Sequence, residues 1–108
     1  MDHVPAADIA FDRHGHDLVV DIVGELDAAT APECSRRIAE RIRPDDEAVW
    51  LNLRCVSVCT PDGVSMITDV HHKAVDRGGH AVVYRPSIAV LRALRMHPLD
   101  DGLLIRTA

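Results

Sequence analysis

The stretch AVWLNLRCVSVCTPDGVSMI, from Ala48 to Ile67, holds an apolar run, then a proline and a glycine, then a second apolar run. Its first six residues are nearly all apolar, which is typical of a strand covered on both faces. Thr60, Pro61 and Asp62 suit the N-cap, N1 and N2 positions of a helix. A hydroxyl can accept a backbone N–H, proline is preset for N1, and a carboxylate favours the positive end of the helix dipole. The stretch therefore predicts a buried strand followed by a helix at about residues 61–77.

The rest of the chain shows the same alternation of strands and helices. Apolar patterning predicts strands at 18–23, 80–84 and 102–107, and helices at about 30–43 and 85–98. Thr30 with Glu33 predicts a capping box at the start of the first helix, and Gly78-Gly79 predicts the end of the second. This alternation predicts parallel strand pairing in an α/β fold, in which helices pack on the sheet.

Length and composition predict one globular domain spanning residues 1–108. Hydrophobic residues make up 47% of the chain, enough for a core of Val, Ile, Leu and Ala. A net charge of −5 and only 3% aromatic residues disfavour direct binding of nucleic acid and favour a partner with a basic surface. No segment has the pattern of an export signal or the length of a membrane span. We therefore expect a cytoplasmic protein without membrane insertion.

The reactive side chains do not form an enzyme motif. The sequence has no nucleophile beside a base, no phosphate-binding glycine loop and no metal-ligand spacing among its seven histidines. We therefore expect a non-enzymatic protein without a cofactor or a metal site, and a thiol or metal enzyme is disfavoured. His71 is expected to be hydrogen-bonded and semi-buried.

The cysteines raise the question of a redox switch. Cys55 and Cys59 would lie about 13 Å apart in a straight strand, too far for a disulfide. A switch between them would require the chain to curl, so it is only a possible redox pair. Cys34 lies on the apolar stripe of the first predicted helix and is expected in the core.

Three runs of the sequence resemble the STAS domain family, whose best-known members are bacterial anti-sigma factor antagonists. They are VVDIVGELDAATAPE, VWLNLRCVSVCTPDGVSMI and the run from Ala74 to Ile105. The most specific pieces are Gly24-Glu25-Leu26-Asp27, the apolar strand with LNL, and the glycine-opened helix that ends at Gly78-Gly79. The resemblance covers about Asp17 to Ile105 and implies a mixed sheet of four to five strands, with helices packed mainly on one face.

In the phosphorylatable antagonists of this family the helix begins with Asp-Ser-Ser-Gly. A partner that is both anti-sigma factor and kinase phosphorylates the first serine. Alignment on Gly63 puts Thr60 in place of the aspartate, Pro61 in place of the acceptor serine and Asp62 in place of the second serine. Proline has no hydroxyl, so the resemblance implies that the usual phosphorylation is missing.

The resemblance also implies a binding site for a kinase-like anti-sigma factor at the helix start and the acidic loop beside it. The expected contact residues are Glu25, Asp27, Thr60, Pro61, Asp62 and Val64. For Glu25 and Asp27 a purely structural role, in a turn before a helix, is an equal alternative. Binding would free a sigma factor, and the protein could also form a homodimer. The alternative function is a cytoplasmic STAS accessory subunit of a lipid-transport ABC complex, which would bind an ATPase instead.

Overall fold

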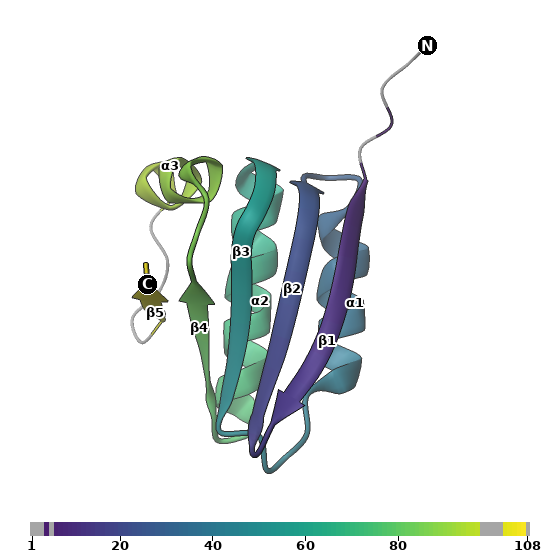
Figure 1. Cartoon of the computed structure of the whole chain (residues 1–108), viewed down its shortest axis with the longest axis vertical. Helices are drawn as coiled ribbons and strands as arrows, with labels where there is room; N and C mark the ends of the chain where they lie inside the picture. Colours follow the sequence, from purple (N-terminus) through teal and green to yellow (C-terminus); the bar gives the residue numbers. More distant parts are fainter. Residues whose placement is uncertain (1–3, 5, 98–102, 108) are drawn as a thin grey trace.

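The computed structural model describes residues 4, 6–97 and 103–107. Within this part of the chain, five strands and three helices form one unit with a single sheet in the order β1-β2-β3-β4-β5 (Figure 1). The elements are β1 (Ala7–His14), β2 (Asp17–Leu26), α1 (Ala31–Arg41), β3 (Ala48–Cys59), α2 (Pro61–Asp76), β4 (His80–Tyr84), α3 (Ile88–Met96) and β5 (Leu104–Arg106). Residues 98 and 102, where a predicted helix ends and a predicted strand begins, lie outside the described residues.

The sheet is mixed. β1 pairs with β2 in antiparallel orientation, and the pairs β2–β3, β3–β4 and β4–β5 are parallel. The mixed sheet implied by the family resemblance is therefore confirmed, while the parallel pairing expected from the alternation is wrong for β1. The sequence pattern did not predict β1, because Ile9 and Phe11 are its only large apolar residues. A two-residue turn joins β1 to β2, and Gly15 provides the positive φ of +63° there.

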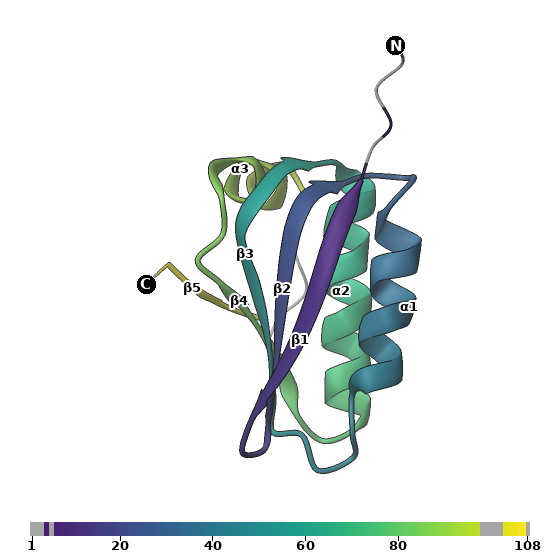
Figure 2. The ribbon, with the colours of Figure 1, turned by 45° about the vertical axis from the view of Figure 1, so that its right-hand side comes forward.

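The long helices lie on one side of the sheet. Figure 2 shows α1 and α2 side by side against the same face, with α3 at the end where β3 finishes. This confirms that the helices pack mainly on one face. Within residues 6–97 and 103–107 no helix covers the opposite face, so the prediction that β3 is covered on both faces is wrong. Its residues Trp50 and Asn52 point to that open face and are half-buried.

The core fills the space between the sheet and the helices. Burial of one Val, Leu or Ile side chain contributes roughly 1.5–3 kcal/mol. Cys34 is in this core, as predicted. His71 is buried as well, and its Nδ1 accepts the backbone N–H of Ala81 at 3.4 Å, which confirms a hydrogen-bonded histidine. The fully buried large side chains of the core include Leu18, Val20, Ile22, Leu26, Ile38, Val49, Leu51, Leu53, Ile67 and Val70.

A buried carboxylate ties β1 to the connection between α1 and β3. Asp46 is 5% exposed, and the Arg13 guanidinium donates to both of its oxygens, at 2.5 and 3.3 Å. The backbone N–H of Arg43 donates to the same carboxylate at 2.7 Å. Burial alone would raise the pKa of Asp46, but these donors outweigh it and the pKa is lowered.

We expect Arg13→Ala to lower the free energy of unfolding by about 2–3 kcal/mol. The loss is smaller than for breaking a fully buried ion pair, because the Arg13 side chain is partly exposed. Because the pKa of Asp46 is lowered in the folded state, its stabilising effect is present above its unfolded pKa of about 4 and lost as the pH falls further. Urea unfolding at neutral and acidic pH measures both effects. Arg77→Ala, at an exposed position, is the control, and equal stability of the two variants would contradict this role of Arg13.

Candidate functional site

The carboxyl ends of β2 and β3 meet beside the N-termini of α1 and α2, at the upper end of the molecule in Figure 1. In the β2–β3 ladder Glu25 is opposite Val58, and Leu26 is opposite Cys59. The backbone N–H of Thr60 donates to the carbonyl of Leu26 at 3.0 Å. The acidic loop and the start of α2 are therefore neighbours, as the family resemblance implied. We call this surface the α2-start site and define it by Glu25, Asp27, Thr60, Pro61 and Asp62.

The residues of the predicted contact set differ in exposure. Pro61 and Asp62 are exposed, and Glu25, Asp27 and Thr60 are partly exposed. Val64 is only 6% exposed and belongs to the hydrophobic core. It is therefore corrected from a partner contact to a core residue. The sequence had placed Val64 on the apolar side of the helix, and that position is what buries it.

Pro61 is the first residue of α2, and Thr60 is its N-cap, as predicted. The side chain of Thr60, however, accepts no backbone N–H of the helix, so the predicted capping bond is wrong. The hydroxyl instead lies 3.5 Å from the carbonyl oxygen of Leu26, to which it donates. The neighbouring strand, rather than the helix, orients this side chain.

The start of α1 also differs from its prediction. Thr30 is the N-cap residue, but its hydroxyl donates to the carbonyl of Glu25 at 2.5 Å and caps no helix N–H. Glu33 pairs with Arg36, so the capping box is wrong. The Asp27 carboxylate accepts the backbone N–H groups of Ala29 and Thr30 at 2.9 and 3.2 Å. Asp27 thus has a structural role in shaping the acidic loop.

Gly63 allows α2 to begin close to the sheet. A Cβ atom at this position would lie 2.8 Å from the sulfur of Cys59, and 3.0 Å from both the Cβ and the carbonyl oxygen of Leu26. Such distances are too short for ordinary contact, so only glycine fits without movement. Gly63 is the glycine of the family motif, and the packing of β2 against the start of α2 is what requires a residue without a side chain there.

Register shifts in the β2–β3 pair give Cys55 and Cys59 different surroundings. The shifts fall between Asp21 and Val23 and between Gly24 and Glu25 of β2. Such irregularities re-aim the side chains of a strand. Cys55 is exposed, whereas Cys59 is partly buried, and burial raises the pKa of its thiol to about 11. Both are free thiols, and Cys59 is poorly suited to react because little of it is thiolate near neutral pH.

We expect the wild type to bind its partner equally under oxidising and reducing conditions, and the double variant Cys55→Ser with Cys59→Ser to do the same. The reason is that neither thiol forms a bridge and the thiol of Cys59 stays protonated. The affinity measured with and without a thiol oxidant tests this. The redox hypothesis would be supported if the wild type, but not the double variant, lost binding on oxidation.

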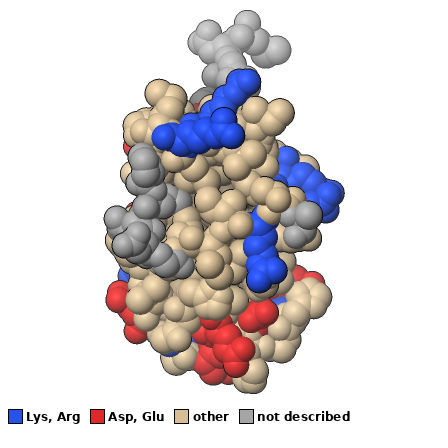
Figure 3. Space-filling view, turned by 90° about the vertical axis from the view of Figure 1, so that its left-hand side faces the viewer, with Lys and Arg blue, Asp and Glu red and all other residues tan. Residues whose placement is uncertain are grey.

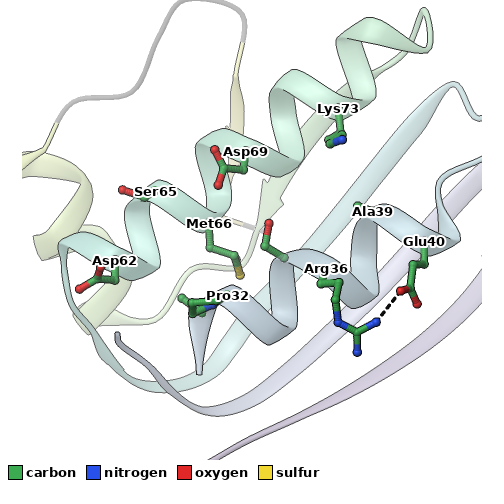
Figure 4. A pocket seen from close by; sticks show the side chains of 11 residues that line it. Pro32, Arg36, Ala39, Glu40, Asp62, Ser65, Met66, Asp69 and Lys73 are labelled. Atoms are coloured by element: carbon green, nitrogen blue, oxygen red, sulfur yellow. Dashed lines mark hydrogen bonds and ion pairs between the residues drawn. The ribbon is translucent and has the colours of Figure 1, made fainter. Parts of the chain in front are cut away.

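A groove of about 610 Å³ runs between α1 and α2 and continues from the α2-start site. Figure 4 shows Asp62 and Pro32 at one end of it and Lys73 and Glu40 at the other. Arg36 lines the groove and is held by Glu33 and Glu40. The sequence pattern did not predict this groove. Its polar and apolar lining residues come from two separate helices, and only the packing of these helices brings them together.

No group of three or more His, Cys, Asp and Glu side chains within the described residues could hold a metal ion. Among the described helices, none is both long and apolar enough to cross a membrane. The α2-start site presents an exposed proline and the carboxylates of Glu25, Asp27 and Asp62. Surfaces of this kind recognise a partner of complementary charge.

The fold agrees with those of solved anti-sigma factor antagonists. One from Mycobacterium paratuberculosis matches with a TM-score of 0.82 at 20% identity, covering 95% of this chain and 87% of that chain. The antagonist SpoIIAA in its unphosphorylated form matches with a TM-score of 0.72 at 14% identity, covering 91% and 87%. The phosphorylated form of SpoIIAA, a Bacillus cell fate determinant, matches with a TM-score of 0.68 at 15% identity, covering 91% and 90%.

A comparison with curated protein sequences found no significant match. The STAS domain model, by contrast, matches residues 8–108, which includes all the described strands and helices except the first residue of β1. The pieces that carried the resemblance, the acidic loop and the glycine-opened helix, are adjacent in the fold. The chain belongs to the STAS domain family.

Proposed function

We propose that this protein is an anti-sigma factor antagonist that acts in the cytoplasm by binding rather than by catalysis. It binds an anti-sigma factor of the kinase-like type through the α2-start site and so frees a sigma factor. The observation that carries the proposal is the place of Pro61, exposed at the first position of α2 beside the acidic loop. The membership in the STAS family and the likeness to antagonist folds support it.

The charges of the site favour a basic partner surface. The carboxylates of Glu25, Asp27 and Asp62 lie at the same end of the folded molecule. The whole chain has a net charge of −5. Carboxylates near a helix N-terminus are stabilised there, and they attract and orient a positively charged partner. The groove between α1 and α2 begins at Asp62, so a partner at the α2-start site can extend along it.

Pro61 makes the binding constitutive in this proposal. An acceptor serine at N1 would carry a phosphate that adds roughly 1.5–2 negative charges at neutral pH. Pro61 has no hydroxyl to accept a phosphate. It still suits the first position of α2, because the backbone N–H that proline lacks would have no partner within the helix. Phosphorylation therefore does not switch this protein off.

Affinity capture of the tagged full chain from its source organism, followed by mass spectrometry, tests this function. The proposal predicts recovery of a kinase-like anti-sigma factor, and Asp62→Lys should reduce that recovery. Recovery of an ABC-type ATPase with its permease would instead support the transporter subunit. Recovery of neither class by a folded protein would contradict the proposal.

Asp62 is a poor substitute for a phosphate. It supplies one negative charge, and it lies one residue beyond the acceptor position, which turns it by about 100° around a helix with 3.6 residues per turn. We expect Asp62→Ser to change the affinity for the anti-sigma factor by less than about tenfold, or 1.4 kcal/mol, with a modest loss if Asp62 pairs with a basic residue. Titration calorimetry measures this, with Asp76→Ser, at an exposed position on the same helix outside the groove, as the control. A tenfold or greater gain in affinity would show that Asp62 imitates the phosphorylated state.

A further inference from the structure

The face of the sheet opposite α1 and α2 carries the only Trp and the only Tyr of the chain. Trp50 and Tyr84 meet edge to face, with ring centroids 5.8 Å apart, and the guanidinium of Arg106 lies 5.9 Å from the centre of the Trp50 ring. The indole N–H of Trp50 donates to Asp17 at 3.2 Å. A shallow hollow of about 380 Å³ opens between Trp50, Tyr84 and Val19. Trp, Tyr and Arg are the residue types that dominate binding energy at protein interfaces.

The ladder register arranges this open face in rows that cross all five strands. Residues opposite one another in neighbouring strands share a face, so each row can be read directly from the pairing. One row contains, from β1 to β5, Asp12, Val19, Trp50, Val82 and Leu104. The next row contains Ala10, Asp21, Asn52, Tyr84 and Arg106.

Acidic and basic side chains lie at opposite ends of these two rows. Their acidic residues, Asp12 and Asp21, lie on β1 and β2, and their basic residue, Arg106, lies on β5. Between the two ends the face is mostly apolar or aromatic, and Leu104 is 47% exposed. In Figure 3, which looks at the edge formed by β4 and β5, charge is also separated along the strands: basic side chains lie in the upper and middle parts and acidic ones gather at the lower end. The face thus has one acidic side and one basic side across an apolar centre.

We propose that this face binds a second copy of the chain, as a symmetric homodimer around a twofold axis that runs along β3. That rotation places β5 of each copy opposite β1 of the other and brings the two Trp50 side chains together at the axis. Arg106 of one copy then faces β1 of the other copy at Ala10, which is in the same row as Arg106. On β1, Asp8 and Asp12 flank Ala10 on the same face, so Arg106 meets an acidic edge. Twofold dimers are the commonest oligomers, and they need a surface that is complementary to itself.

The size of the face sets the expected strength of the dimer. Strands about 4.8 Å apart and roughly eight residues long give a face of about 600 Å². Two copies would then bury on the order of 1,200 Å², the lower end of specific interfaces, and the dimer should be weak and sensitive to salt. The α2-start site lies at the end of the sheet rather than on this face, so the dimer does not depend on the proposed function.

Sedimentation equilibrium of the full chain, from about 5 to 500 µM, tests the dimer directly. The average mass should rise from 11.9 kDa towards twice that value, and raising the salt from about 50 to 500 mM should weaken association. Trp50 is the only tryptophan, so its fluorescence should shift to shorter wavelength over the same concentration range. A mass that stays at 11.9 kDa throughout would overturn the proposal.

Charge changes identify the face. Arg106→Glu and Asp12→Lys should each weaken association by about tenfold or more, and the two together in one chain should restore it to within about threefold. The controls are Arg77→Glu, at the C-cap of α2, and Asp69→Lys, within α2. They make the same charge changes away from the open face and should associate like the wild type. Circular dichroism confirms that each variant is folded. Association that is unchanged in folded Arg106→Glu and Asp12→Lys, or lost equally in the controls, would overturn the assignment to this face.

Discussion

Replacement of Gly63 by valine is expected to lower the free energy of unfolding by about 3 kcal/mol. The first atom of any side chain there would lie 2.8 Å from the sulfur of Cys59 and 3.0 Å from the backbone oxygen of Leu26. The sulfur can move, but the Leu26 carbonyl is held in place because it accepts the backbone N–H of Thr60. The start of α2 must therefore move away from β2, which also distorts the α2-start site. Urea unfolding measures the change.

Ser65→Val is the matched control, because it adds the same side chain to an exposed position two residues later in α2. It should change the stability by no more than about 0.5 kcal/mol. Adding Cys59→Ala to Gly63→Val should recover part of the loss, since it removes the closest contact. If Gly63→Val does not fold, Gly63→Ala serves in its place, with an expected loss of about 1–2 kcal/mol. Stability of either Gly63 variant equal to that of Ser65→Val would contradict the described packing.

The double change Thr60→Asp with Pro61→Ser is expected to introduce a phosphorylation switch that the wild type lacks. It restores the hydroxyl at N1, where the helix N-terminus stabilises a phosphate, and the carboxylate before it. After incubation with the kinase-like anti-sigma factor and ATP, this variant should gain one phosphate. It should then lose affinity for that partner by about 100-fold, or 2.7 kcal/mol, because the site gains nearly two negative charges. Intact mass and calorimetry measure the two effects.

Thr60→Asp with Pro61→Ala is the control for this switch, because it makes the same change at the N-cap without an acceptor. It should stay unphosphorylated and keep the same affinity with and without ATP. The proposal would be contradicted if the Thr60→Asp, Pro61→Ser variant bound the partner equally well after phosphorylation. It would also be contradicted if this variant never bound the partner.

The sequence predicted α2 to within a residue at each end, because its boundaries have local chemical causes. Pro61 can begin a helix but cannot continue one, and Gly78, with a φ of +90°, supports the left-handed turn that follows. β3 was predicted to end at Leu53, yet it continues to Cys59. Its last residues follow no simple alternation, because the register shifts against β2 interrupt the periodicity that identifies a strand.

The side-chain roles at the candidate site were harder to predict than its location. The hydroxyls of Thr30 and Thr60 bind carbonyl groups of residues 25 and 26, which belong to β2 rather than to their own helices. Capping rules consider only the helix, so they could not anticipate an acceptor from a neighbouring strand. Val64 was placed correctly on the apolar side of α2, but its assignment as a partner contact ignored that this side faces the sheet. The open face that carries Trp50 could not be predicted, because strands with one or two covered faces have similar apolar runs.

In the proposed function, the α2-start site binds a kinase-like anti-sigma factor and cannot be switched off by phosphorylation. The most direct measurement is the affinity of the wild-type protein for the captured anti-sigma factor, before and after incubation of the pair with ATP and magnesium, with intact mass recorded on the same samples. We expect no added phosphate and an affinity that stays within about twofold. A phosphate on Thr60, or a tenfold or greater loss of affinity after incubation with ATP, would contradict it.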